Sequence, residues 1–225
     1  FMTLGPKISW IKHYYKKIWF NFSVLLSAII LNFLIFYFFG SYSILSNLII
    51  ISSIFLIIHS LNDLIESIKK RIKIDMSRIV SHIGFGFLVF FIGINHNYSI
   101  EKDFNLKVGE EKKLEKYQIN FNDLKIENEK NYKTIVGEFT SLNLKNNSKE
   151  ILKPEIRIYN KPETLTYEAS IKTNFFSDTY ITMSNINRSD YYNIKFQKKP
   201  FMLWIWISAI TVSIGGFIRL FKIKN

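Results

Sequence analysis

The segment Ile18–Asn62 reads IWFNFSVLLSAIILNFLIFYFFGSYSILSNLIIISSIFLIIHSLN and has no Asp, Glu, Lys or Arg in its 45 residues. A membrane hydrocarbon core about 30 Å thick needs about 20 apolar helical residues, so this run is long enough for two spans. Gly40 and the residues after it form a turn signal near its middle. The segment therefore predicts a transmembrane helical hairpin with helices at 18–39 and 44–61, and it excludes an ordinary soluble domain.

Two further uncharged runs occur later in the chain. One covers the 22 residues of Ile79–Ile100, and the other covers the 19 residues of Pro200–Ile218. Each is about long enough to cross a bilayer once. We therefore expect a third transmembrane helix at 79–95 and a fourth at 201–218.

The distribution of charge predicts how these helices cross the membrane. Of the formal net charge of +12, residues 97–200 contribute 18 Lys/Arg against 15 Asp/Glu, and the remainder lies in short segments beside the apolar runs. These segments, 1–17, 63–78 and 219–225, carry four, five and three basic residues. Short basic segments stay on the cytoplasmic side. We therefore predict a cytoplasmic juxtamembrane segment, a cytoplasmic connector and a cytoplasmic tail. The basic balance points to a lipid bilayer and not to nucleic acid.

The segment 96–200 has the pattern of an all-β domain. Polar and apolar residues alternate in Glu155–Tyr159 and in Tyr192–Phe196, as they do in half-buried strands. Asn- and Gly-containing turn signals separate the runs. We expect six to eight short strands in a small sandwich or barrel. The fold class is thus a membrane protein with four transmembrane α-helices and an extracytoplasmic all-β domain inserted between helices 3 and 4.

Several classes of chemistry are excluded by residue type. The chain has no Cys, so disulfides, thiolate metal sites and thiol nucleophiles are ruled out. It shows no phosphate-binding loop and no Ser-His-Asp pattern. The carboxylates of 101–168 alternate with Lys and are interpreted as solvated strand faces. The chain starts at Phe1 without a signal segment, and we interpret it as a fragment or as one piece of a split protein.

His82 is the strongest candidate for chemistry. It lies four residues after Arg78 inside the third predicted helix, and an ionisable side chain within a membrane is by default a functional hypothesis. His82, Gly86, Val89 and Gly93 share one helical stripe. Two glycines beside a histidine leave a shallow groove, which suits either a neighbouring helix or the edge of a haem whose iron binds the imidazole. The residues leave both interpretations open.

The other three histidines carry weaker signals. His13 lies among lysines and is interpreted as solvated. His96 lies between two asparagines at the outer interface and is interpreted as an interfacial polar residue. His59 ends the second predicted helix at a depth similar to that of His82, so a bis-His site within one chain is geometrically allowed. Any histidine near a helix end satisfies this spacing, and it favours such a site only weakly.

A set of short motifs resembles the C-terminal part of the CcmF family, the membrane haem lyases of cytochrome c maturation in bacteria and some mitochondria. The motifs occur in the family's order and cover nearly the whole chain: Ser81–Gly86, Phe91–Ile94, Tyr98–Asp103, Gly109, Tyr132, Thr166–Glu168, Asp178–Tyr180, Lys199–Phe201, Trp204–Trp206 and Gly215–Gly216.

The resemblance implies a function and a ligand. Such proteins attach haem to the CxxCH thiols of apocytochrome c and hold a b-type haem between two transmembrane histidines. His82 matches the second of these histidines, in a His-x-Gly context, whereas His59 and His96 match no ligand of the family. The first histidine belongs to an upstream region that this chain lacks. The resemblance therefore implies haem b as cofactor, with His82 as one axial ligand of the iron and the other outside the chain, and no catalytic residue of the chain's own.

The resemblance also implies partners and a location. The partners are the N-terminal portion or split subunit, other cytochrome c maturation proteins, a haem-carrier protein and apocytochrome c. The location is the bacterial inner membrane with a periplasmic β domain, or the mitochondrial inner membrane. The chain alone is not expected to be active. The alternative function is a cofactor-free, membrane-anchored binding module whose β domain docks a partner protein.

Overall fold

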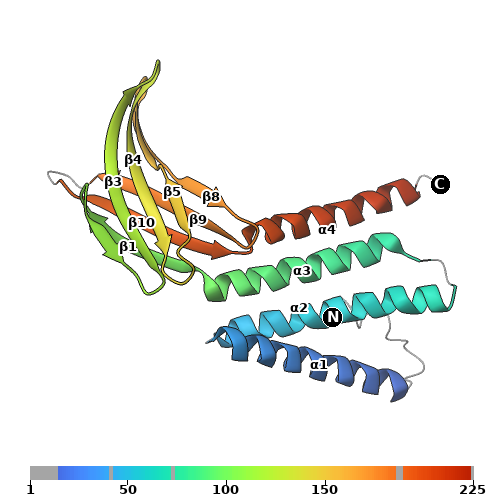
Figure 1. Ribbon diagram of the computed structural model, residues 1–225. Coiled ribbons are helices and arrows are strands. Elements are labelled where there is room, and N and C mark those ends of the chain that lie inside the picture. The colour runs from blue at the N-terminus through green and yellow to red at the C-terminus, as the bar shows by residue number, and fades with distance from the viewer. Residues whose placement is uncertain (1–14, 41–42, 72–73, 186–189, 224–225) are drawn as a thin grey trace. The chain divides into compact units, whose positions relative to one another are not determined.

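The computed structural model describes residues 15–40, 43–71, 74–185 and 190–223. The chain divides into a helical unit, residues 1–98 with 201–225, and a β unit, residues 99–200. In the part of the chain that is described, the helical unit has four helices (Figure 1): α1 (Tyr15–Phe39), α2 (Ile44–Lys69), α3 (Met76–Tyr98) and α4 (Met202–Ile223).

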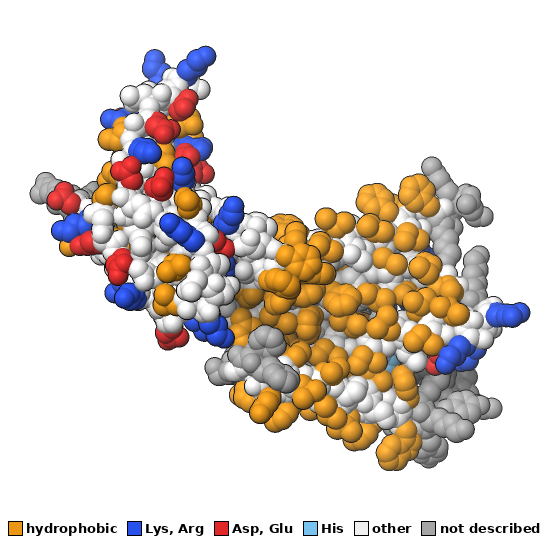
Figure 2. Space-filling view, in the orientation of Figure 1, with side chains coloured by type: hydrophobic (Ala, Val, Ile, Leu, Met, Phe, Trp, Pro, Cys, Tyr) orange, Lys and Arg blue, Asp and Glu red, His pale blue; other side chains and the backbone are white. Residues whose placement is uncertain are grey.

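All four helices are long and apolar enough to cross a membrane. The expectation of four spans with a β domain between the third and the fourth is therefore confirmed. Large apolar side chains cover the outside of the helices (Figure 2), and Trp19 is 70% exposed. Such a surface is unfavourable in water but is the normal surface of a helix in lipid.

The second and third helices extend beyond the expected transmembrane segments. α2 begins after Ser43, whose hydroxyl accepts a hydrogen bond from the Ser46 N–H (3.2 Å) and so satisfies one of the free donors of the first turn. Its last turns carry an ion pair one turn apart between Glu66 and Lys70 (2.8 Å), of a kind that supports helix formation. Much of the expected polar connector 63–78 is therefore helical.

The β unit contains ten strands within its described residues, more than the six to eight expected. Four form sheet A in the order β1-β10-β9-β8, and six form sheet B in the order β2-β3-β4-β6-β7, with β5 beside β4. All of the pairings are antiparallel. The strands are β1 (Ile100–Leu106), β2 (Glu111–Lys113), β3 (Tyr117–Asn128), β4 (Tyr132–Asn143), β5 (Lys149–Leu152), β6 (Glu155–Asn160), β7 (Glu163–Glu168), β8 (Ser170–Thr173), β9 (Ser177–Asn185) and β10 (Tyr192–Pro200).

The core of the β unit draws on both sheets. Period-2 alternation turns every second side chain inward, so Ile181 and Met183 of β9 meet Phe121 and Phe139 of sheet B, whose rings stack at 4.3 Å. The buried cluster comprises Leu106, Ile119, Phe121, Phe139, Leu152, Ile156, Ile181, Met183, Ile194 and Phe196. Charged side chains lie on the outside of this unit (Figure 2). The core thus confirms an all-β domain that folds around its own apolar interior.

Candidate functional site

The helix that carries His82 is in close contact with α4 on one side. A Cβ atom added to Gly84 would lie 2.9 Å from the Val212 backbone nitrogen, and one added to Gly215 would lie 2.7 Å from the Ser81 backbone nitrogen. The Ser77 hydroxyl donates a hydrogen bond to the Gly215 carbonyl (2.8 Å). Small residues and a polar bond of this kind are what holds helices together in lipid.

The glycines of the His82 stripe belong to a second close contact, with α2. A Cβ on Gly86 would lie 2.6 Å from Cγ1 of Ile57, and a Cβ on Gly93 would lie 3.0 Å from Cγ1 of Ile50. The sequence left a helix and a macrocycle as alternative occupants of this groove. In the structure, α2 fills the groove at both glycines.

His82 itself lies beside this contact and is only half-buried. Arg78, one turn earlier, and Asp63 of α2 are the charged groups that act on it, and these two approach each other to 3.9 Å. Farther along the same side of α3, Phe85 and Ile92 are exposed. The imidazole therefore lies on the side of α3 that carries exposed apolar side chains, and an imidazole in such a position could bind a haem iron.

The structure describes two of the other three histidines. His59 is buried in α2, and its ring packs edge-on against Phe20 of α1, at 5.4 Å, and tilted against Phe55, at 4.4 Å. His96 is exposed in the last turn of α3. His13 lies outside the described residues. His59 is thus on the α1 side of α2, whereas His82 lies at the contact between α2 and α3.

The β unit contains a polar cluster that the sequence analysis missed. Lys198 of β10 and Glu150 of β5 form an ion pair (3.4 Å) that is largely buried. The Lys198 ammonium donates to the Thr179 hydroxyl (2.5 Å), which donates to Glu150 (2.5 Å), and the Asn174 amide also donates to Glu150 (2.6 Å). We call Asn174, Thr179, Lys198 and Glu150 the polar clamp, because they join sheet A to sheet B. Glu150 had been interpreted as solvated.

The polar clamp changes the electrostatics of a neighbouring tyrosine. Burial, and then the negative charge of Glu150, raise the pKa of Tyr117 above its ordinary value. The Lys198 ammonium lies 5.9 Å from the centre of the Tyr117 ring. No sequence signal marks these residues, because Glu150 and Lys198 are 48 positions apart and lie among many similar Lys and Glu. Their location suggests a structural role between the sheets and not catalysis.

The chain is similar in sequence to one family of known proteins. Residues 97–200 match the family model described as "CcmF C-terminal beta-sandwich". The "Cytochrome c-type biogenesis protein CcmF" of Haemophilus influenzae is 25% identical over 156 residues, which are 68% of this chain and 24% of that protein. The protein of the same name from Escherichia coli is 26% identical over 145 residues, or 64% of this chain and 22% of that protein. The chain thus aligns with about a quarter of the length of these relatives.

A solved structure extends the similarity to the helices. The protein titled "Cytochrome c Heme Lyase CcmF" superposes with a TM-score of 0.72 over 95% of this chain and 36% of that chain, at 13% sequence identity. At that sequence identity the superposition shows that the two proteins share a fold. It includes both the four helices and the β unit, and so reaches beyond the segment that the family model matches.

Proposed function

Because this chain corresponds to the C-terminal region of the CcmF family, we propose that it forms the C-terminal part of a membrane haem lyase that attaches haem to apocytochrome c. The observation that carries the proposal is the family match of the β unit, together with the CcmF relatives that align with about two thirds of the chain. The superposition over 95% of the chain adds that the fold is shared. The chain aligns with only about a quarter of the length of these relatives. The proposed activity therefore requires an upstream region, as part of the same protein or as a split subunit.

We assign His82 to this function as one axial ligand of a membrane b-type haem. Three features support the assignment: the residue is an imidazole within a membrane-spanning helix, it is half-buried, and it borders an apolar surface with Phe85 and Ile92. A bound haem would supply the redox and ligand chemistry of its iron. The close contacts of Gly84 and Gly86 with the two neighbouring helices hold α3, and therefore the imidazole, in place. The second axial ligand would come from the upstream region.

The proposal includes a location and partners. Three short basic segments favour cytoplasmic ends, so the β unit would lie in the periplasm of a bacterial inner membrane, or in the corresponding space of a mitochondrion. There it would meet apocytochrome c, a haem-carrier protein and other maturation proteins. Apocytochrome c would bring the thiols, which is compatible with a chain that has no Cys.

The absorption spectrum of the purified chain, with and without the upstream region of the same organism's protein, tests this function. We expect a low-spin bis-histidine haem b spectrum only when the two parts are combined. Haem bound by this chain alone would require a second ligand within it, for which His59 would be the first residue to replace. A combined preparation that supports cytochrome c assembly but never binds haem b would contradict the ligand assignment.

The histidines offer a matched pair of variants. His82→Ala should lower haem b occupancy at least about tenfold, since an axial bond to iron is lost, while His96→Ala, in the exposed last turn of the same helix, should leave it unchanged. If His82→Ala retains full haem b and full cytochrome c assembly, the ligand assignment is wrong. The alternative, a cofactor-free binding module, predicts instead that His82 substitutions act only through helix packing and that deletions within residues 101–198 abolish association with partners.

A further inference from the structure

The hairpin between β8 and β9 has an unusual tip. The Asn174 N–H donates to the Ser177 carbonyl (3.0 Å), which leaves Phe175 and Phe176 as the two residues of the turn. Their rings meet edge to face at 5.0 Å, and the side chains are 55% and 66% exposed. Gly, Asn, Asp, Pro and Ser dominate such turns. Two aromatic rings in their place give the tip an exposed apolar surface.

The register of sheet A shows at which end of the β unit this tip lies. Ser177 pairs with Pro200, the last residue of β10, and α4 begins two residues later, at Met202. On the other side of β10, Ile100 pairs with Lys198 and follows α3 with only Ser99 between them. The tip therefore lies at the end of sheet A where the chain arrives from one membrane-spanning helix and leaves into the next. We call this the membrane-proximal end of the β unit.

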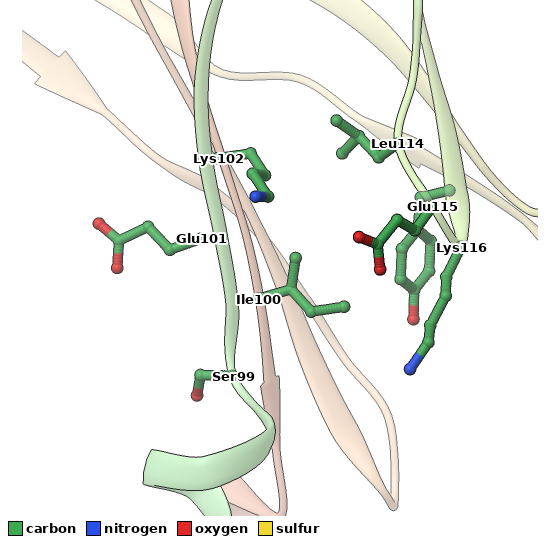
Figure 3. A pocket seen from close by; sticks show the side chains of 8 residues that line it. Ser99, Ile100, Glu101, Lys102, Leu114, Glu115 and Lys116 are labelled. Carbon is green, nitrogen blue, oxygen red and sulfur yellow. The ribbon is translucent and has the colours of Figure 1, made fainter. Parts of the chain in front are cut away.

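Two turns of sheet B lie at the same end. Residues 114–116, between β2 and β3, and Tyr117 at the start of β3 line an open pocket of about 270 Å³ together with Ser99 and Ile100 (Figure 3). The Leu144 N–H, in the turn after β4, donates to the Lys116 carbonyl (3.0 Å). These turns expose Leu144, Lys116 and Lys145. The membrane-proximal end thus combines exposed apolar side chains with lysines.

The polar clamp fixes the base of the hairpin. Asn174, directly before the two phenylalanines, donates to Glu150, which also accepts from Thr179 and pairs with Lys198. The hairpin is therefore tied to β5 and β10 before it meets any partner. A surface that is already ordered loses less conformational entropy on binding.

We propose that Phe175 and Phe176 insert into the headgroup region of the bilayer and anchor the β unit to the membrane surface, with Lys116 and Lys145 beside lipid phosphates. Aromatic side chains favour the membrane–water interface, and Lys side chains can extend from apolar surroundings to polar headgroups. The junctions with α3 and α4 must lie at that interface, because the two helices cross the bilayer. This proposal depends on the four spans and the register of sheet A, and not on the haem function.

The absence of Cys from the chain allows a direct test with single labels. The full chain with the substitution Phe176→Cys is labelled at that cysteine with the environment-sensitive fluorophore NBD. The labelled chain is then reconstituted in phosphatidylcholine–phosphatidylglycerol vesicles. The matched control is Ile126→Cys, an apolar position of similar exposure (58%, against 66% for Phe176) near the end of β3 that lies away from Lys116. We expect lipids with nitroxide headgroups to quench the label at 176 about two-fold more than the label at 126, and aqueous iodide to quench it less.

Three results would overturn the proposal or replace its partner. Equal quenching at the two positions by lipid and by iodide would show that the tip is in water. Protection at 176 from both quenchers would show that protein, not lipid, covers it. In the Phe176→Cys background, Phe175→Ser should raise iodide quenching, and a lack of change would also count against insertion. If the Phe176→Cys chain fails to fold by circular dichroism, a label at Leu144→Cys tests the same end and must be quenched by lipid.

Discussion

The helical unit and the β unit use similar apolar residues in opposite places. In the helical unit, rings such as Trp19 and Phe217 lie outside, while Ala28 and Ser46 are buried. In the β unit, Phe139 is fully buried and most of the charged residues lie outside (Figure 2). In water the burial of apolar surface drives folding, whereas lipid gives no such gain, and close approach and polar bonds take its place. The surroundings, more than composition, decide which residues form an interior.

The largest effect should come from the core of the β unit. Phe139→Ala removes a fully buried ring that stacks on Phe121, and it should lower the free energy of unfolding of this unit by about 3–5 kcal/mol. Hydrogen exchange of the β4 amides in the full chain measures this loss. The matched Phe176→Ala should leave exchange nearly unchanged, because its ring is exposed. Similar losses at both positions would erase the distinction between core and surface.

Close helix contacts should give the next largest effect. Gly215→Val places a side chain 2.7 Å from the Ser81 backbone nitrogen and 3.0 Å from the Ser77 carbonyl, and overpacking of this kind costs about 1–3 kcal/mol. Gly216→Val is the control, since a Cβ there has nothing within 4 Å. Resistance of the helical unit to unfolding in detergent should fall only for Gly215→Val. Equal sensitivity would mean that small residues do not hold α3 to α4.

The polar clamp tests whether the β unit also depends on buried polar bonds. Lys198→Met leaves the Glu150 carboxylate without its cation but with its hydrogen bonds from Thr179 and Asn174, and should cost about 2 kcal/mol. The double variant Lys198→Met with Glu150→Leu should recover part of the loss, because no uncompensated charge remains. Urea unfolding of the β unit in vesicles measures both. A single variant as stable as the parent chain would show that the ion pair is not needed.

The smallest effect should come from the exposed ion pair between Lys195 of β10 and Glu101 of β1. The hydrogen bond from Lys195 to Glu101 holds the pKa of the Glu101 carboxyl below its ordinary value. Since the pKa is lowered in the folded state, the associated stability is present above the unfolded pKa of about 4.5 and is lost as the pH falls through the folded value. Lys195→Met should therefore raise the Glu101 pKa in an NMR titration and change stability little. A loss as large as that of Lys198→Met would contradict the difference between buried and exposed pairs.

The broad architecture could be predicted because its signals are long and local. The 45 uncharged residues from Ile18 and the two later runs reveal the spans without knowledge of their neighbours. The continuation of α2 to Lys69 was missed because charge, and not helical periodicity, was taken to mark its end. The number of strands was underestimated because β2 has three residues and β5 and β8 have four each, too few to show alternation.

The candidate site was predictable only in part. His82 stands out as an ionisable residue in an apolar helix, but which helix fills the groove at Gly86 depends on Ile57, far along the chain. The polar clamp depends on side-chain contacts between β5 of sheet B and β9 and β10 of sheet A, which local patterns do not show. The tip at Phe175 and Phe176 had a usable signal, since two aromatic residues stand between the turn formers Asn174 and Ser177.

The contact between α3 and α4 joins residues that the ribosome makes at different times. Ser77 bonds to Gly215, 138 positions later, and the β unit is synthesised between the two helices. At about 5–20 residues per second, α3 waits in the membrane for several seconds or longer before its partner emerges. During that interval β1 must also wait for β10, its only neighbour within the described sheet A. The last strand and the last helix therefore complete the two units almost at once, and a chain interrupted before β10 would leave both open.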